Sequence, residues 1–314
     1  MIGRQSGRAE PVKVAGGGSP VAVPNGPPPR WWQGRQGVRR TGNDGIGALM
    51  DKQGASGPGA FEKVRFLGLA FDQLGTKPAL VWLLERAADA PYFYVTTPNV
   101  DHIVRLHTEA HSDDVRAAYA DSDLTLCDSK VLALLARCYG VHLHVGPGSD
   151  ITADLFAVLA GSDAPVVIIG GDDHTLPRLR EAYGLTRMVQ HVPPMGLIRN
   201  RAALDAAAQF IVDNPARFIF IAVGSPQQEV IAWRARQMGA TQGIALCIGA
   251  SIDYLTGRSH RAPMLFRVLA LEWLYRLIRE PRRLWRRYLV RSPRIFSLVE
   301  RDARRRRKAR KVRP

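Results

Sequence analysis

The sequence of 314 residues has few features of a secreted or membrane-spanning protein. Its three cysteines, Cys127, Cys138 and Cys247, form neither a C-x-x-C pair nor a zinc-binding pattern with histidine. We interpret them as small buried side chains in a reducing cytoplasm. No run of 18 apolar residues is present, and the N-terminus lacks the continuous apolar stretch of a signal peptide. We therefore expect neither a spanning helix nor a signal peptide, so any membrane contact would be peripheral.

A further absence concerns dinucleotide chemistry. The chain has no complete G-x-G-x-x-G followed by an acidic residue at the required spacing, which argues against a hydride-transferring enzyme. It does have Gly170-Gly171 directly after an apolar run. Glycines at such a place let backbone N–H groups approach a phosphate closely, so Gly170 and Gly171 are candidate substrate-binding residues.

Positive charge is abundant but unevenly distributed. The formal net charge is +16, and residues 264–314 alone hold 18 Lys/Arg against 4 Asp/Glu. Residues 1–61 hold 8 and 3, whereas residues 62–263 hold 18 and 21. A mildly acidic body thus has a basic C-terminal appendage, which implies an anionic partner. Because no recognisable nucleic-acid-binding motif occurs in the body, we expect a membrane surface and no nucleic acid; a nucleic-acid-binding protein using the Arg-rich end is the alternative.

The composition predicts three parts. Residues 1–61, rich in Gly, Pro and Ser, are predicted to be a disordered leader. Residues 62–263 are predicted to be a globular α/β domain. Residues 264–314 place apolar and aromatic side chains at near-helical spacing among arginines, which indicates a basic amphipathic helical appendage that lies on anionic lipid. The alternative is a helix that packs on the body and leaves its basic face in solvent.

The middle part alternates short apolar runs with segments of helical period. The expected strands are 64–67, 92–96, 124–127, 143–145, 166–169, 187–191, 218–223 and 243–248. The expected helices are 78–88, 100–120, 130–139, 151–161, 176–183, 201–213 and 229–238. This alternation predicts an α/β fold with a mostly parallel sheet and helices on both faces. Ligands of such sheets bind at the carboxyl ends of the strands.

Polar segments follow several of these expected strands. Thr97 and Asn99 come after 92–96, where they either cap the next helix or face a substrate. Asp128 comes directly after 124–127, where it is either an N-cap or a general base for an acceptor hydroxyl. The turn after 218–223 carries amide and carboxylate groups suited to hold sugar hydroxyls, on Gln227, Gln228 and Glu229; Gly224 of the same turn is a further candidate for substrate binding, unless it and Pro226 only form the turn.

In this order the segments resemble the WecG/TagA/CpsF family of inverting glycosyltransferases, from about residue 64 to about residue 288. The first blocks that carry the resemblance are Thr97-Pro98-Asn99, 120–128, Gly148-Ser149-Asp150, 191–196, 224–229 and 249–253. The most persuasive blocks are Arg261-Ala262-Pro263, 271–276 and 280–283 with Arg286. Two departures are present: Ser129-Lys130 follows Asp128 where the family usually has glycine, and an arginine expected shortly before Gly148 is missing.

The resemblance implies a Rossmann-like catalytic domain, a UDP-sugar donor and an acceptor sugar linked to polyprenyl diphosphate. It further implies that Asp128 is the catalytic base, with Thr97 and Gln228 in the active site and Asp253 where the nucleotide binds. The resemblance also implies that three residues of the appendage close over the diphosphate: Arg276, Arg283 and Arg286.

For the reaction we predict one in-line displacement, in which Asp128 takes the acceptor proton while the arginines and the backbone of Gly170 and Gly171 stabilise the departing diphosphate. Asp172-Asp173 does not form Asp-x-Asp, and the arginines make a cation redundant, so we expect no metal and no other cofactor. The expected location is the cytoplasm, peripheral on the inner face of the cell membrane. A nucleotide-binding protein of the same fold class, for example one that binds NAD, is the second alternative.

Overall fold

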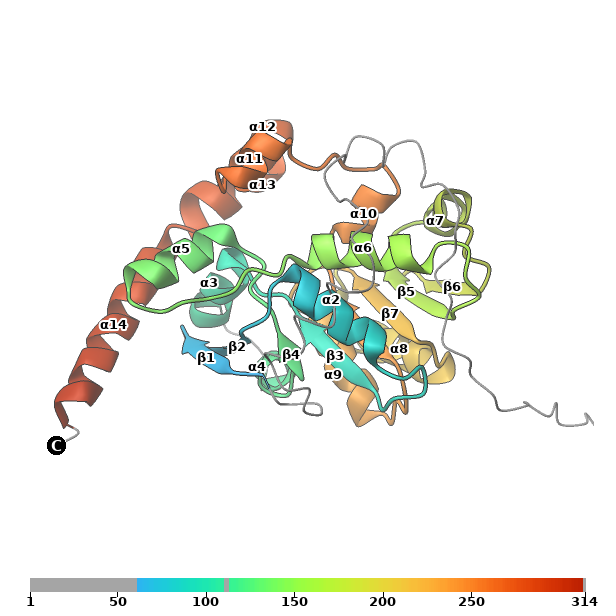
Figure 1. Ribbon diagram of the computed structural model, residues 1–314, viewed down its shortest axis with the longest axis horizontal. Coiled ribbons are helices and arrows are strands. Elements are labelled where there is room, and N and C mark those ends of the chain that lie inside the picture. Colours follow the sequence, from blue (N-terminus) through green and yellow to red (C-terminus); the bar gives the residue numbers. More distant parts are fainter. Residues whose placement is uncertain (1–60, 110–112, 313–314) are drawn as a thin grey trace, which may run out of the picture.

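The computed structural model describes residues 61–109 and 113–312 (Figure 1). Six strands form one sheet in the order β4-β3-β8-β7-β5-β6, and every neighbouring pair is parallel. The strands are β3 (Phe93–Thr96), β4 (Leu124–Thr125), β5 (Val166–Gly170), β6 (Met188–His191), β7 (Phe218–Ala222) and β8 (Ile244–Cys247). The predicted parallel α/β fold is confirmed.

Helices cover both faces of this sheet because successive strand residues point to opposite sides. In β7, Phe218 and Phe220 pack into one hydrophobic core, and Ile219 and Ile221 pack into the other. The first core is closed by α2 (Thr76–Glu85), α6 (Gly148–Leu159), α7 (Thr175–Tyr183) and α10 (Ser251–Leu255). The second is closed by α3 (Val100–Thr108), α4 (Asp113–Ala120), α5 (Lys130–Cys138), α8 (Arg201–Asp213) and α9 (Gln227–Gln237).

Three details differ from the expected elements. The first expected strand pairs as β1 (Lys63–Phe66) with an unpredicted β2 (Leu69–Asp72), in an antiparallel hairpin apart from the parallel sheet. Leu67 and Gly68 both have positive φ (50° and 83°), which suits a two-residue hairpin turn. The expected strand 143–145 forms only a single bridge, between Val145 and Cys127. The expected helix 100–120 is two helices, with α3 ending at Thr108.

The appendage is mostly helical over its described length. It consists of α11 (Met264–Val268), α12 (Glu272–Arg279), α13 (Pro281–Trp285), the π-helix η3 (Arg286–Arg291) and α14 (Arg294–Val312), and α14 runs along one end of the molecule (Figure 1). Ile295, Leu298 and Val299 at the start of α14 join the core beside α3. The appendage therefore packs on the body in part and is anchored by apolar burial. The predicted leader, apart from Phe61, lies outside the described residues.

Within the described ranges, no helix combines the length and the apolar character needed to cross a bilayer.

Candidate active site

Asp128 lies three residues beyond the end of β4, at the carboxyl edge of the sheet. Its backbone N–H donates to the carbonyl of Pro98 (3.1 Å), which fixes the loop. Ser129, not Asp128, caps α5, because the Ser129 hydroxyl accepts from the Leu132 N–H (3.1 Å). The Asp128 carboxylate instead accepts a hydrogen bond from the N–H of Gly148, the first residue of α6. The N-cap alternative for Asp128 is thereby excluded.

The surroundings of Asp128 favour a carboxylate that gains and loses a proton near neutrality. Burial raises its pKa to about 7, against the opposing effect of the Arg276 guanidinium, and the carboxylates of Glu272 and Asp150 add to the increase. Arg276 and Glu272 belong to α12, so the appendage contributes directly to this site. Arg276 also lies over the ring of Tyr254, with 5.4 Å between the guanidinium carbon and the ring centroid.

Thr97 lies beside this carboxylate site. Its hydroxyl donates to the carbonyl of Cys247 (2.9 Å), and the residue is buried. A Cβ placed on Gly148 would lie 3.0 Å from the Thr97 hydroxyl oxygen, so Thr97 packs directly against the residue that holds Asp128. Asn99, in contrast, is a helix cap, because its side chain accepts from the N–H groups of Asp101 and His102 at the start of α3.

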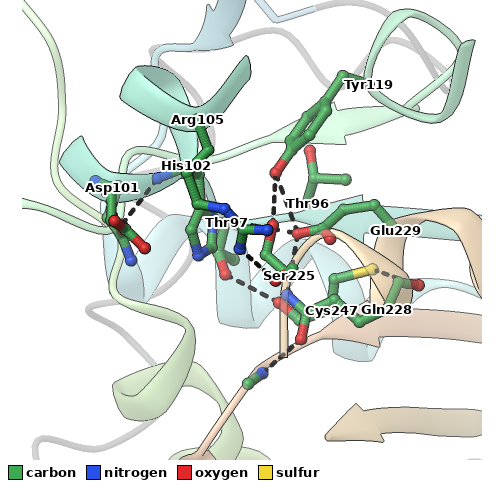
Figure 2. A network of polar contacts seen from close by, with 12 residues as sticks. Thr96, Thr97, Asp101, His102, Arg105, Tyr119, Ser225, Gln228, Glu229 and Cys247 are labelled. Atoms are coloured by element: carbon green, nitrogen blue, oxygen red, sulfur yellow. Dashed lines mark hydrogen bonds and ion pairs between the residues drawn. The ribbon is translucent and has the colours of Figure 1, made fainter. Parts of the chain in front are cut away.

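Gln228 and Glu229 belong to a buried polar network that joins α3, α4, α9 and the end of β8 (Figure 2). The Gln228 amide donates to the Glu229 carboxylate (2.9 Å), and its carbonyl accepts from the Gly249 N–H (2.9 Å). The Tyr119 hydroxyl donates to the same carboxylate (3.2 Å). Both side chains are enclosed, and burial raises the pKa of Glu229. The structure thus places Glu229 inside the protein, where it supports the loop and does not line the surface.

The other residues of that turn stay at the end of β7. Gln227 donates from its side-chain amide to the carbonyl of Val223 (2.8 Å), and Gly224 has a φ of +79° that favours glycine. Gly224, Gln227 and Gln228 therefore shape the turn that leads into α9.

Gly170 and Gly171 have a packing reason for being glycine. Their φ values are +107° and +77°, and a Cβ on Gly170 would lie 2.8 Å from the carbonyl oxygen of Ala222 on neighbouring β7. A Cβ on Gly171 would clash with the Thr175 hydroxyl. The Gln190 amide holds the Gly170 carbonyl from β6 (2.7 Å). The glycine pair thus lies at the carboxyl edge of the sheet, and the carbonyl of Gly170 is already hydrogen-bonded to Gln190.

Asp253 on α10 is linked to the loop after β5. Arg258 lies 3.5 Å from Asp253 and 3.3 Å from Asp172. Burial raises the pKa of Asp253, while Arg258 and the appendage residue Arg283 lower it. The positive charge of the appendage therefore acts on two carboxylates of the site, on Asp128 through Arg276 and on Asp253 through Arg283.

The whole arrangement spans the part of the chain that matches a known family. The model of the Glycosyl transferase WecG/TagA/CpsF family matches residues 64–309. The chain belongs to this family. It is therefore a glycosyltransferase of cell-surface polysaccharide synthesis, and the matched region includes the body together with most of the appendage.

One appendage arginine is placed differently in this glycosyltransferase. Arg286 is exposed on η3 and lies over the ring of its neighbour Trp285, at 5.3 Å. In the described part of the chain its guanidinium makes no ion pair with Asp128 or Asp253. Of the three implied diphosphate ligands, Arg276 acts electrostatically on Asp128 and Arg283 on Asp253, and Arg283 is itself exposed and paired with Glu280 (2.6 Å).

The contacts by which the glycosyltransferase holds its appendage could not be predicted from the sequence. Asp101 in the first turn of α3 forms an ion pair with Arg287 (3.2 Å) and accepts a hydrogen bond from Arg291 (3.3 Å), both of η3, and its carboxylate is almost fully buried. Arg291 also approaches Glu109 (3.8 Å). The only signal in the sequence was an acidic residue at a helix start, which ordinarily interacts with the helix dipole.

No group of three or more His, Cys, Asp or Glu side chains within residues 61–109 and 113–312 is arranged to hold a metal ion.

Proposed function

We propose that this glycosyltransferase moves a sugar from a UDP-sugar to a sugar acceptor linked to polyprenyl diphosphate, with inversion at the anomeric carbon. The observation that carries the proposal is Asp128, a carboxylate at a strand end with a pKa of about 7 that faces a guanidinium from the appendage. A general base works best when its pKa lies near the working pH. Cations beside it suit a reaction that releases a diphosphate.

The proposed chemistry is a single displacement. Asp128 removes the proton of the acceptor hydroxyl, whose oxygen forms a bond to the anomeric carbon as the bond to UDP breaks. Attack opposite the leaving group inverts that carbon. Arg276 and Arg283 stabilise the negative charge that develops on UDP, so no bound metal ion is required.

The direct test is a screen of UDP-sugars with a short-chain lipid-diphosphate-sugar acceptor, followed by mass spectrometry. We expect one UDP-sugar to add one sugar residue to the acceptor and to release UDP in equal amount. A parallel thermal-shift comparison of UDP with NAD distinguishes the alternative nucleotide-binding class. Stabilisation by NAD but not by UDP, with no sugar transfer from any donor, would contradict the proposal.

The pH dependence of the rate tests the base. Only the ionised carboxylate can accept a proton, so the activity per enzyme should increase as the pH rises through about 7, where half of Asp128 is ionised, and then level off. We expect this increase in kcat/KM for the acceptor, measured at saturating donor. A rate that is already maximal at pH 5 would show that a different group accepts the proton.

The appendage is proposed to lie on anionic lipid at the inner face of the membrane, with the enzyme in the cytoplasm. It exposes apolar side chains on α11 and its C-cap, on α12 and on η3, next to its arginines: Met264, Leu265, Val268, Leu269, Ile278, Leu289 and Val290. Apolar side chains beside a basic surface are the combination that binds the interface of anionic bilayers. Such contact would bring the site to a lipid-linked acceptor.

A Leu265→Gln/Val268→Gln variant is expected to bind vesicles containing anionic phospholipid about 10-fold or more weakly, because two exposed apolar side chains no longer enter the interface. Co-sedimentation across a salt series measures the effect. Met195→Gln is the matched control, since Met195 is fully exposed but lies outside the appendage. RNA tested in parallel addresses the nucleic-acid alternative: tighter binding to RNA than to vesicles at equal salt would favour it.

A further inference from the structure

Arg261 lies between α10 and α11, where the body meets the appendage. One of its terminal nitrogens, Nη2, donates to the Ser149 hydroxyl (2.9 Å) and to the Asp150 carboxylate, both in the first turn of α6. The adjacent residue of α6, Gly148, donates to Asp128. Arg261 is thus fixed at the same helix start that holds the proposed base.

The other terminal nitrogen of Arg261 is not used. Nη1 is buried and has no hydrogen-bond partner among residues 61–109 and 113–312. A guanidinium stays charged at all relevant pH values, so its N–H groups remain donors. Leaving a buried donor without an acceptor is unfavourable, which indicates that Nη1 is kept for a ligand oxygen.

The charges around Arg261 favour an anionic ligand. Asp150 is shared by two guanidinium groups, because Arg267 also contacts it (3.1 Å). A third guanidinium is near, because Arg276 interacts with Asp128 and with Tyr254, and Tyr254 also interacts with Arg261. The N-terminus of α6 contributes positive potential at the same place. A hydrogen bond from a guanidinium N–H to a phosphate oxygen is charge-assisted, so even the single unpaired nitrogen Nη1 suits a phosphate.

We propose that Arg261, held at the start of α6, is a diphosphate-binding cation whose Nη1 donates to a diphosphate oxygen. The inference rests on the proposed function for the identity of the ligand, a diphosphate that belongs either to the nucleotide donor or to the lipid-linked acceptor. Asp150 and Ser149 then act as positioning residues that hold the guanidinium in place.

The test compares Arg261→Met with Arg267→Met, which removes the second guanidinium on Asp150 but not the unpaired nitrogen. Titration calorimetry of the full-length proteins measures the binding of inorganic pyrophosphate and of UDP, and kinetics at saturating donor measure the acceptor KM. Arg261→Met should weaken the binding of the diphosphate ligand about 10- to 100-fold, the scale of a lost charge-assisted contact. Arg267→Met should change it by less than about 3-fold.

The two measurements distinguish the source of the diphosphate. Weaker UDP binding with an unchanged acceptor KM would assign Arg261 to the nucleotide, and the reverse would assign it to the acceptor. Arg261→Lys keeps the charge without the planar fork and should restore only part of the affinity. It replaces the Met variant in the test if the Met variant fails to fold.

Unchanged binding of pyrophosphate, UDP and acceptor in a folded Arg261 variant would overturn the inference. Equal losses in Arg261→Met and Arg267→Met would also overturn it. If wild-type enzyme transfers no sugar, the proposed function fails while pyrophosphate binding still tests Arg261.

Discussion

Asp128→Asn is expected to lower kcat by about 100-fold or more, the usual scale for removal of a general base. Asparagine has nearly the same shape as aspartate, and its carbonyl can still accept the Gly148 N–H that the carboxylate accepts. It cannot take a proton, so the acceptor hydroxyl is no longer activated. UDP-sugar binding should be nearly intact, because the leaving-group contacts come from other side chains. Single-turnover rates and donor affinity, measured separately, give the two quantities.

Ser129→Ala is the matched control for this variant. It is the next residue in the chain and removes a side chain that only caps α5. Loss of an N-cap costs about 1 kcal/mol of stability, so the control should unfold at lower temperature and still turn over at close to the wild-type rate. Wild-type turnover by Asp128→Asn would remove Asp128 from the role of base. An equal loss of rate in both variants would point to a damaged loop.

The parallel sheet could be predicted because its strands are short continuous apolar runs. Phe218–Ala222 is apolar throughout, as expected for a strand covered on both faces. The β1–β2 hairpin could not be separated from the sheet in the same way. Both of its strands are short, and only the positive φ at Leu67 and Gly68 reveals the turn. Residues 143–145 include two apolar side chains and were expected to form a strand, yet they make only one bridge.

The site could be predicted as far as its position at the strand ends. Asp128 was identified because a carboxylate at that place either caps a helix or faces a substrate, and the structure shows that Ser129 is the cap. The burial of Glu229 could not be predicted, because it depends on Tyr119, which is 110 positions away in the chain. The link between Arg261 and Asp150 joins residues 111 positions apart. Pairings of this kind are set by packing that no local pattern encodes.

Removal of residues 264–314 is expected to abolish activity, with a loss of at least about 100-fold even if the body stays folded, because Arg276 and Arg283 leave the site. Vesicle binding should disappear together with activity, since the exposed apolar and basic side chains are deleted. This variant also uncovers the core surface that Ile295, Leu298 and Val299 cover, so circular dichroism must first establish that the body is folded.

Two further variants separate loss of the arginines from loss of the core contact. Removal of residues 301–314 alone keeps the buried start of α14 together with Arg276, so this variant should retain most of its transfer activity and lose only part of its vesicle affinity.

Asp101→Asn keeps every appendage residue but weakens the ion pairs with Arg287 and Arg291. Those guanidinium groups would then face a neutral amide at a nearly buried position, which favours detachment of η3. We expect kcat and UDP affinity both to fall, because Arg276 and Arg283 move away with the appendage, together with faster proteolysis after residue 263 and partial rescue in Asp101→Glu. A fully active enzyme lacking residues 264–314 would show instead that the body performs catalysis alone.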